Sequence, residues 1–439
     1  MKKTASIVPY LNKKRLRNGN TALQNCQFPF FSYLCKKNIT IMRKFLFALA
    51  LLAATSLSAK SDKNQVVATW TTAIQKVEPH NLAPAPYLAG NSLRQIVEVS
   101  FGGKEVSLKL SNEYNTEETE ILGVELARAL SQGENATIDE STLTALTFGG
   151  KKGVTMKPGE VIVSDPVKFR LTPRMNVAIT IHFGKASQKD VTGHPGSRTS
   201  SYIAKGNTND FSGAVETAHW YYINSLLVKA GKKYGAVAAI GNSITDGRGT
   251  TTNKQNRWTD ILSARLLANK GTKYLSVLNL GLGGNCVMRG GLGPTANSRY
   301  DRDVLNQEGV KYAIVFEGVN DLGGSRDGVA TANGLIESYK VMIKKAHEKG
   351  IKIYGGTIMP FKGNGYYNES REKGRQMVNE WIRTSGEFDG VIDFDAVMRD
   401  PEQPDRLNPE FLFENDWLHP NASGYRTMGE AIDLTLFEE

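Results

Sequence analysis

The sequence predicts a β-rich region over residues 60–230 followed by an α/β domain over residues 231–439. Short β-prone runs recur in the first region, separated by Gly, Asn, Asp and Pro. From residue 232 onward, short apolar runs alternate with segments of helical spacing, which is typical of a parallel sheet covered by helices on both faces. The length of 439 residues and the 40% hydrophobic content suit a globular protein of two domains. They exclude collagen, a disordered polymer and a polytopic membrane protein.

The β-rich region is expected to form a β-sandwich or jelly roll, because many short strands follow one another at close spacing. The expected strands cover residues 66–72, 95–101, 105–110, 160–163, 167–171 and 177–183. Residues 197–212 are rich in Ser, Gly, Asn and Thr, and this composition predicts a loop.

The α/β domain is expected to have three layers, α/β/α, around a parallel five-stranded sheet. The expected strands are 236–240, 274–280, 311–316, 351–358 and 391–394, and the expected helices are 257–269, 299–306, 330–349, 370–384 and 421–437. In such sheets, ligands bind beyond the carboxyl ends of the strands. We therefore expect the chemistry in the loops that follow these strands.

Residues 42–59 have the pattern of a secretory signal peptide: two basic residues, an apolar run and then small residues. The run is too short to span a bilayer comfortably. We expect translation to begin at Met42, residues 1–41 to be an upstream misreading, and the mature protein to be periplasmic or secreted. After cleavage only Cys286 remains, so no intrachain disulfide is expected, and a small buried filler is the favoured role for its side chain.

The net charge of +10 does not indicate a nucleic-acid partner. Residues 1–59 contain ten Lys and Arg residues and no Asp or Glu, and the remaining chain holds 44 basic and 44 acidic residues. The six His residues show no metal-binding spacing, and no nucleotide-binding loop is complete. We expect neither a metal nor a cofactor.

Four loops carry residues that together form a catalytic set. They read GNSITDG at 241–247, NLGLGGN at 279–285, EGVND at 317–321 and DWLHP at 416–420. They supply a Ser hydroxyl in a turn after a strand, glycines that expose backbone amides, an Asn amide, and a His with a carboxylate three residues before it. Each feature alone is weak, but their combination predicts nucleophilic catalysis.

These four blocks resemble those of the SGNH/GDSL hydrolase superfamily of serine esterases, whose α/β/α domain is flavodoxin-like. The resemblance covers residues 232–439. It implies that Ser243 is the nucleophile, His419 the general base and acid, and Asp416 the carboxylate that orients His419. It also implies an oxyanion hole made of the amides of Ser243 and Gly284 and the side chain of Asn320. One position departs from the family, because Asn242 stands where an Asp is usual.

The strings at 247–250, 257–258 and 300–305 resemble a narrower branch of arylesterase-like and acetylesterase-like enzymes, encoded with hemicellulases in gut and rumen Bacteroidales. This resemblance implies removal of short acyl groups, often acetyl, from plant polysaccharides or oligosaccharides. Arg248 and Arg257 are either pocket residues or structural ion-pair partners. Trp70 and the aromatic residues at 220–222 either stack on sugars or belong to the core.

Three other functions are open at this point: a lipid esterase or lysophospholipase on the same triad, an arylesterase, and a carbohydrate-binding protein with a silent esterase domain. The sequence does not specify the glycan, the acyl position or the oligomeric state.

Overall fold

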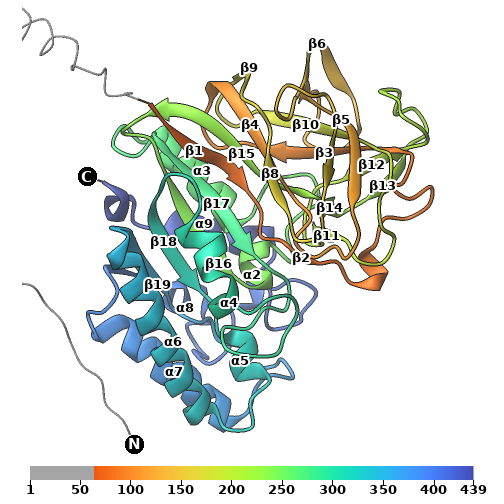
Figure 1. Ribbon diagram of the computed structural model, residues 1–439. Helices are drawn as coiled ribbons and strands as arrows, with labels where there is room; N and C mark the ends of the chain where they lie inside the picture. Colours follow the sequence, from red (N-terminus) through yellow and green to blue (C-terminus); the bar gives the residue numbers. More distant parts are fainter. Residues whose placement is uncertain (1–63, 439) are drawn as a thin grey trace, which may run out of the picture. The chain divides into compact units, whose positions relative to one another are not determined.

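The computed structural model describes residues 64–438 (Figure 1). The predicted signal peptide and the residues before it lie outside this range. The described residues belong to one compact unit, Lys63–Glu439. Among them, no helix combines the length and the apolar character that a membrane span requires.

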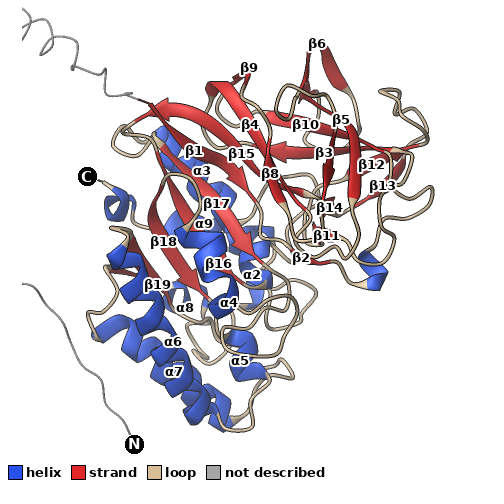
Figure 2. Ribbon diagram, viewed as in Figure 1, coloured by secondary structure: helices blue, strands red, loops and turns tan. Residues whose placement is uncertain are grey.

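The first part of the described chain consists almost entirely of strands (Figure 2). They are β1 (Asn64–Thr71), β2 (Gln75–Lys76), β3 (Ser92–Glu98), β4 (Gly103–Ser111), β5 (Thr119–Ala129), β6 (Ile138–Ala145), β7 (Val154–Met156), β8 (Val161–Val163), β9 (Val167–Leu171), β10 (Asn176–Phe183), β11 (Thr192–His194), β12 (Ser201–Ala204), β13 (Val215–Thr217), β14 (Trp220–Tyr221) and β15 (Ile223–Gly231). One short 3₁₀ helix, η1 (Pro79–Asn81), interrupts them.

These strands form antiparallel sheets whose apolar faces share one core. One sheet has the order β13-β12-β3-β10-β5-β6 with β7 beside β5, a second has the order β1-β15-β4-β8 with β9 beside β4, and a small third sheet is β14-β11-β2. Alternate side chains point into the core: Val106, Leu108 and Leu110 from β4, and Val177, Ile179 and Ile181 from β10. The predicted β-sandwich is consistent with this arrangement.

Several strands of this region were not predicted, and the longest of them are β5, β6 and β15. The strand β6 is mostly exposed and carries Thr and Ser, so it lacks the alternation that marks a half-buried strand. The predicted loop 197–212 is wrong at Ser201–Ala204, which forms β12 because its backbone pairs with β3, about a hundred residues away in the sequence.

The second part is an α/β domain whose five-stranded sheet is parallel throughout, as predicted, and its strand order is β17-β16-β18-β19-β20. Its strands are β16 (Gly235–Gly241), β17 (Leu275–Gly281), β18 (Val310–Phe316), β19 (Lys352–Gly356) and β20 (Gly390–Ile392). Its helices are α2 (Ser243–Asp246), α3 (Trp258–Ala268), α4 (Ala296–Tyr300), α5 (Val319–Gly323), α6 (Gly328–Glu348), α7 (Glu369–Thr384), α8 (Phe394–Met398) and α9 (Ala422–Ala431). The helices α3, α8 and α9 pack together on one face, and α4 to α7 pack on the other (Figure 1).

Two predicted helices differ from the structure in detail. The helix expected at 299–306 is α4 followed by a π-helical turn, η2 (Asp301–Leu305). The closing helix expected at 421–437 ends at Ala431, because Ile432 is extended, and a 3₁₀ turn, η4 (Leu434–Phe437), follows with Asp433 as its cap. Another 3₁₀ turn, η3 (Pro409–Phe411), precedes the last loop.

The β-rich region covers the free edge of β17. The hydroxyl of Ser100 accepts the amide of Val277 at 3.1 Å, and the hydroxyl of Ser276 donates to the carbonyl of Ala68 at 2.6 Å. An uncovered edge strand would leave such backbone groups without partners. The β-rich region therefore lies directly beside β17, the strand before the loop at 279–285 that is predicted to be catalytic.

Candidate active site

The turn after β16 presents Ser243 at the carboxyl end of the sheet. Asn242 caps α2, because its Oδ1 accepts the amide of Ile244 at 3.0 Å. The helix is short, and Gly247 ends it in the left-handed region at φ 101°. Ser243 thus begins a helix, where backbone N–H groups lack partners within the helix and favour negative charge.

Ser243, His419 and Asp416 form a continuous hydrogen-bonded chain. The Oγ of Ser243 lies 2.8 Å from Nε2 of His419, and Nδ1 of His419 lies 2.6 Å from Oδ2 of Asp416. The other carboxylate oxygen of Asp416 accepts the backbone amides of Leu418 and His419. Although burial opposes it, these hydrogen bonds hold the pKa of Asp416 below its ordinary value, so the carboxylate stays ionised beside the imidazole.

The loop that carries Asp416 and His419 has a strained backbone. Asn415 and Trp417 both adopt left-handed conformations, at φ 54° and 56°. The side-chain amide of Asn364 donates to the carbonyl of Asp416 at 2.7 Å, which holds the loop from outside. Strain of this kind persists only where surrounding contacts over-determine the backbone, and it is frequent at functional sites.

Two more predicted residues lie at the ends of the neighbouring strands. Gly284, after β17, has φ 66°, a conformation that favours glycine. Asn320 is in α5, after β18, and its Nδ2 donates to the carbonyl of Asn285 at 2.7 Å. Tyr366 donates its hydroxyl to Oδ1 of Asn320 at 3.0 Å and so fixes which way the amide faces. Tyr366 was not among the residues predicted from the sequence.

A cleft of about 960 Å³ begins at Gly284 and Asn320. Its other lining residues include Met288, Arg289, Arg326 and Tyr366. Cys286 also borders it but is only 5% exposed, and burial raises the pKa of its thiol to about 12. This side chain is a protonated, poorly accessible thiol, in agreement with the role of a buried filler.

A buried arginine connects the two strand ends that carry Ser243 and Gly284. The guanidinium of Arg299 donates to the carbonyl of Gly241 at 3.0 Å and to that of Leu280 at 2.7 Å. It also donates to the side chain of Asn285 and pairs with Asp303, and its own side chain is fully buried. Residues 300–305 therefore directly follow Arg299, and Asp303 within them pairs with it. This supporting role of Arg299 was not predicted from the sequence.

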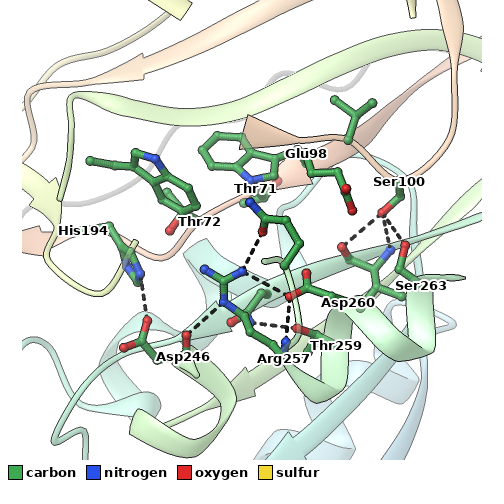
Figure 3. Close-up of a pocket in the computed structure, with 16 residues that line it drawn as sticks. Thr71, Thr72, Glu98, Ser100, His194, Asp246, Arg257, Thr259, Asp260 and Ser263 are labelled. Atoms are coloured by element: carbon green, nitrogen blue, oxygen red, sulfur yellow. Dashed lines mark hydrogen bonds and ion pairs between the residues drawn. The ribbon is translucent and has the colours of Figure 1, made fainter. Parts of the chain in front are cut away.

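The two candidate pocket arginines lie in different environments. Arg248 is exposed, and its guanidinium is 6.0 Å from the ring centre of Phe413. Arg257 is 6% exposed; its Nε donates to the carbonyl of Asp246 at 3.1 Å, and its Nη1 pairs with Asp260 (Figure 3). The contacts of Arg257 are those of a structural partner, and its side chain lines a small pocket of about 40 Å³.

The aromatic residues that were candidates for sugar stacking are buried. Trp70 and Trp220 pack edge to face with ring centres 5.1 Å apart, and both are less than 9% exposed. Tyr221 and Tyr222 are completely buried. They belong to the core, which leaves the β-rich region without a stacking platform at these positions. In the described part of the chain, no group of His, Cys, Asp and Glu is arranged to hold a metal ion.

Comparison with known proteins identifies the α/β domain. Residues 239–427 match the model of the GDSL-like Lipase/Acylhydrolase family. The chain carries a GDSL-like acylhydrolase domain. This makes the protein a carboxylic ester hydrolase. No curated protein matches the sequence.

Solved structures similar to this acylhydrolase include three from the same broad group. A GDSL-like lipase from Bacteroides thetaiotaomicron is 19% identical, with 47% of this chain and 90% of that chain covered and a TM-score of 0.34. The acetylxylan esterase Axe2 from Geobacillus stearothermophilus is 18% identical, with 46% and 93% covered and a TM-score of 0.35. The acetyl xylan esterase AlAXEase is 21% identical, with 45% and 96% covered and a TM-score of 0.34.

Proposed function

We propose that this ester hydrolase is a secreted or periplasmic serine esterase that removes short acyl groups, chiefly acetyl, from plant-type polysaccharides or oligosaccharides. The observation that carries the mechanism is the chain of hydrogen bonds from Ser243 through His419 to Asp416, at 2.8 and 2.6 Å. A nucleophile, a base and an orienting carboxylate within this reach form the arrangement that acyl transfer needs.

In the proposed reaction, Ser243 attacks the ester carbonyl while Nε2 of His419 takes the hydroxyl proton. The tetrahedral oxyanion is stabilised by the amides of Ser243 and Gly284 and by the side chain of Asn320, where each such donor is worth roughly 10²–10³ in rate. The bond between the carbonyl carbon and the sugar oxygen then breaks while His419 protonates that oxygen, so the sugar leaves as a hydroxyl and the acyl group stays on Ser243. In the second half, His419 activates water, which releases the carboxylic acid and regenerates Ser243.

Two features support a polysaccharide substrate: residues 247–250 and 300–305 resemble those of arylesterase-like and acetylesterase-like enzymes, and a cleft lies beside the site. The cleft of about 960 Å³ is lined by Gly284 and Asn320 but not by Ser243 or His419, so it lies beside the triad, where it is large enough to hold sugars. Secretion is supported by the signal-peptide pattern of residues 42–59.

The test measures acetate release from acetylated xylan by the purified protein and by Ser243→Ala, with p-nitrophenyl acetate and a long-chain p-nitrophenyl ester in parallel. We expect acetate release by the wild type, and loss of it in the variant. Turnover of p-nitrophenyl acetate without acetate release from xylan would refute the substrate but keep the mechanism. Faster turnover of the long-chain ester would favour a lipid esterase, and full activity of Ser243→Ala would refute the mechanism.

A further inference from the structure

Two side chains of the β-rich region hold the helix that begins with Ser243. Asp246, at the other end of α2, is 2% exposed. Its Oδ1 forms a hydrogen bond with Nε2 of His194 at 2.9 Å (Figure 3), and its Oδ2 accepts a hydrogen bond from Nη2 of Arg198 at 2.6 Å. Both partners come from the segment that begins with β11, so a region outside the acylhydrolase family match contacts the nucleophile helix directly.

The ring of His194 is itself fixed in place. Its Nδ1 lies 2.9 Å from the carbonyl of Ala73, and the ring packs with its centre 5.7 Å from that of Trp220. Both ring nitrogens therefore lie within hydrogen-bond distance of an oxygen atom, and these two contacts fix the orientation of the ring. Burial disfavours the ionised carboxyl of Asp246, but the charge of Arg198 and the hydrogen-bond contact with His194 outweigh burial and hold the pKa of Asp246 below its ordinary value.

Two glycines let the backbone pack closely around Asp246. A Cβ at Gly196 would lie 2.0 Å from Oδ2 of Asp246, and a Cβ at Gly281, at the end of β17, would lie 2.2 Å from its amide nitrogen. The helix α2 is therefore enclosed between a loop of the β-rich region and the parallel sheet. A helix of four residues has little stability of its own, so these contacts determine where it lies.

We propose that His194 and Arg198 are positioning residues for the esterase reaction: by holding Asp246 they fix α2, and with it the Oγ of Ser243 within reach of His419. This inference rests on the proposed function. It gives the β-rich region a part in catalysis, as the element that completes the nucleophile turn, instead of the role of a separate glycan-binding module.

The test compares Arg198→Ala and the conservative Arg198→Lys with a matched control, Lys109→Ala. Lys109 pairs with Glu308 at 2.7 Å, also between the β-rich region and the α/β domain, but Glu308 lies outside α2. With p-nitrophenyl acetate, we expect Arg198→Ala to lower kcat about 10- to 100-fold with little change in KM, because small misplacements of reacting groups have effects of this size. Arg198→Lys is expected to recover part of kcat, and Lys109→Ala to keep wild-type kcat with a lower Tm.

The inference is overturned if Arg198→Ala behaves like Lys109→Ala, with a lower Tm and an unchanged kcat. Should Arg198→Ala fail to fold, His194→Gln and Arg198→Lys are assayed well below their Tm, and wild-type kcat in both would overturn it. Labelling of Ser243 by a fluorophosphonate distinguishes failure of the proposed esterase function from failure of the positioning role. If the wild type neither turns over esters nor becomes labelled, both the proposed function and this inference are refuted. If the wild type is active and the variants at His194 and Arg198 keep its kcat, only the inference is refuted.

Discussion

The side-chain amide of Asn242 donates a hydrogen bond of 2.9 Å to Oε2 of Glu317, and the amide of Gly318 donates to the same oxygen at 3.0 Å. Asn242 therefore links the nucleophile turn to the end of β18, since its own Oδ1 accepts Ile244. Glu317 is 1% exposed, and burial raises its pKa to about 8, while Arg299 and Asn242 act in the opposite direction.

Replacing Glu317 by Gln should change how stability depends on pH. In the unfolded chain the carboxyl ionises near 4.5, whereas the folded protein keeps its proton up to about pH 8. The folded state binds more protons in this interval, so Glu317 lowers the free energy of unfolding as the pH rises, by up to about 1.4 kcal/mol per pH unit. Urea unfolding at pH 5 and pH 8 should show Glu317→Gln gaining stability over the wild type at pH 8 but not at pH 5. An equal difference at both pH values would contradict this.

Asn242→Asp restores the residue usual in the family and should make activity sensitive to alkaline pH. Asp can accept the amide of Ile244 but has no proton to donate to Glu317. While Glu317 is protonated it can donate to Asp instead, and once it ionises two buried carboxylates face each other. We expect near wild-type kcat/KM at pH 6.5 and a steeper fall at a pH above 8, because the Asp carboxylate raises the pKa of Glu317 beyond the value of about 8 that it has beside Asn242. The double variant Asn242→Asp/Glu317→Gln should lose this additional fall, and its persistence there would assign the fall to another group.

Arg299→Met should destabilise the protein strongly. It removes the donor to the carbonyls of Gly241 and Leu280 and one partner of Asp303, all in the interior. Breaking such a buried network typically costs about 3–5 kcal/mol. Chemical denaturation would measure this loss beside Arg426→Met, a surface arginine whose nearest carboxylate is 3.8 Å away. For Arg426→Met we expect a change within about 1 kcal/mol. Similar losses in the two variants would contradict the account.

Tyr366→Phe should lower kcat without changing the fold. The variant removes only the hydroxyl that donates to Oδ1 of Asn320, so the amide of Asn320 loses the contact that orients it. We expect a fall in kcat smaller than the roughly 10²–10³-fold loss typical when an oxyanion donor is removed, as in Asn320→Ala. Steady-state kinetics with p-nitrophenyl acetate measures both variants. An unchanged kcat in Tyr366→Phe would show that Asn320 needs no orientation by this hydroxyl.

The main features of the α/β domain follow from local sequence patterns. Its five strands are short apolar runs, and three of the four catalytic loops come directly after a strand, so their meeting at one sheet edge could be expected. The fourth, with Asp416 and His419, is recognisable because its carboxylate and imidazole are three residues apart. Local patterns also predicted strands such as β9 and β10, whose burial alternates or whose residues are strongly β-prone.

No local sequence pattern predicted the contacts that hold the site residues in place. His194 lies 52 residues from Asp246, and Tyr366 lies 46 residues from Asn320. A single His at the end of a three-residue strand, or a single Tyr in a loop, gives no periodicity and no motif, so its partner is visible only once the chain has folded. The same holds for β12, whose four residues are a strand because β3 and β13 pair with them. Long-range pairing overrides local composition at these positions.

The most direct test of the central claim is to identify the residue that becomes acylated. Rapid acid quenching during the first turnovers of p-nitrophenyl acetate, followed by peptide mass spectrometry, should find an acetyl group on the peptide that contains Ser243. His419→Ala should form this adduct far more slowly, because the hydroxyl has lost its base. An acetyl group on another residue, or full turnover without any adduct on Ser243 under conditions that trap a serine acyl-enzyme, would contradict the account.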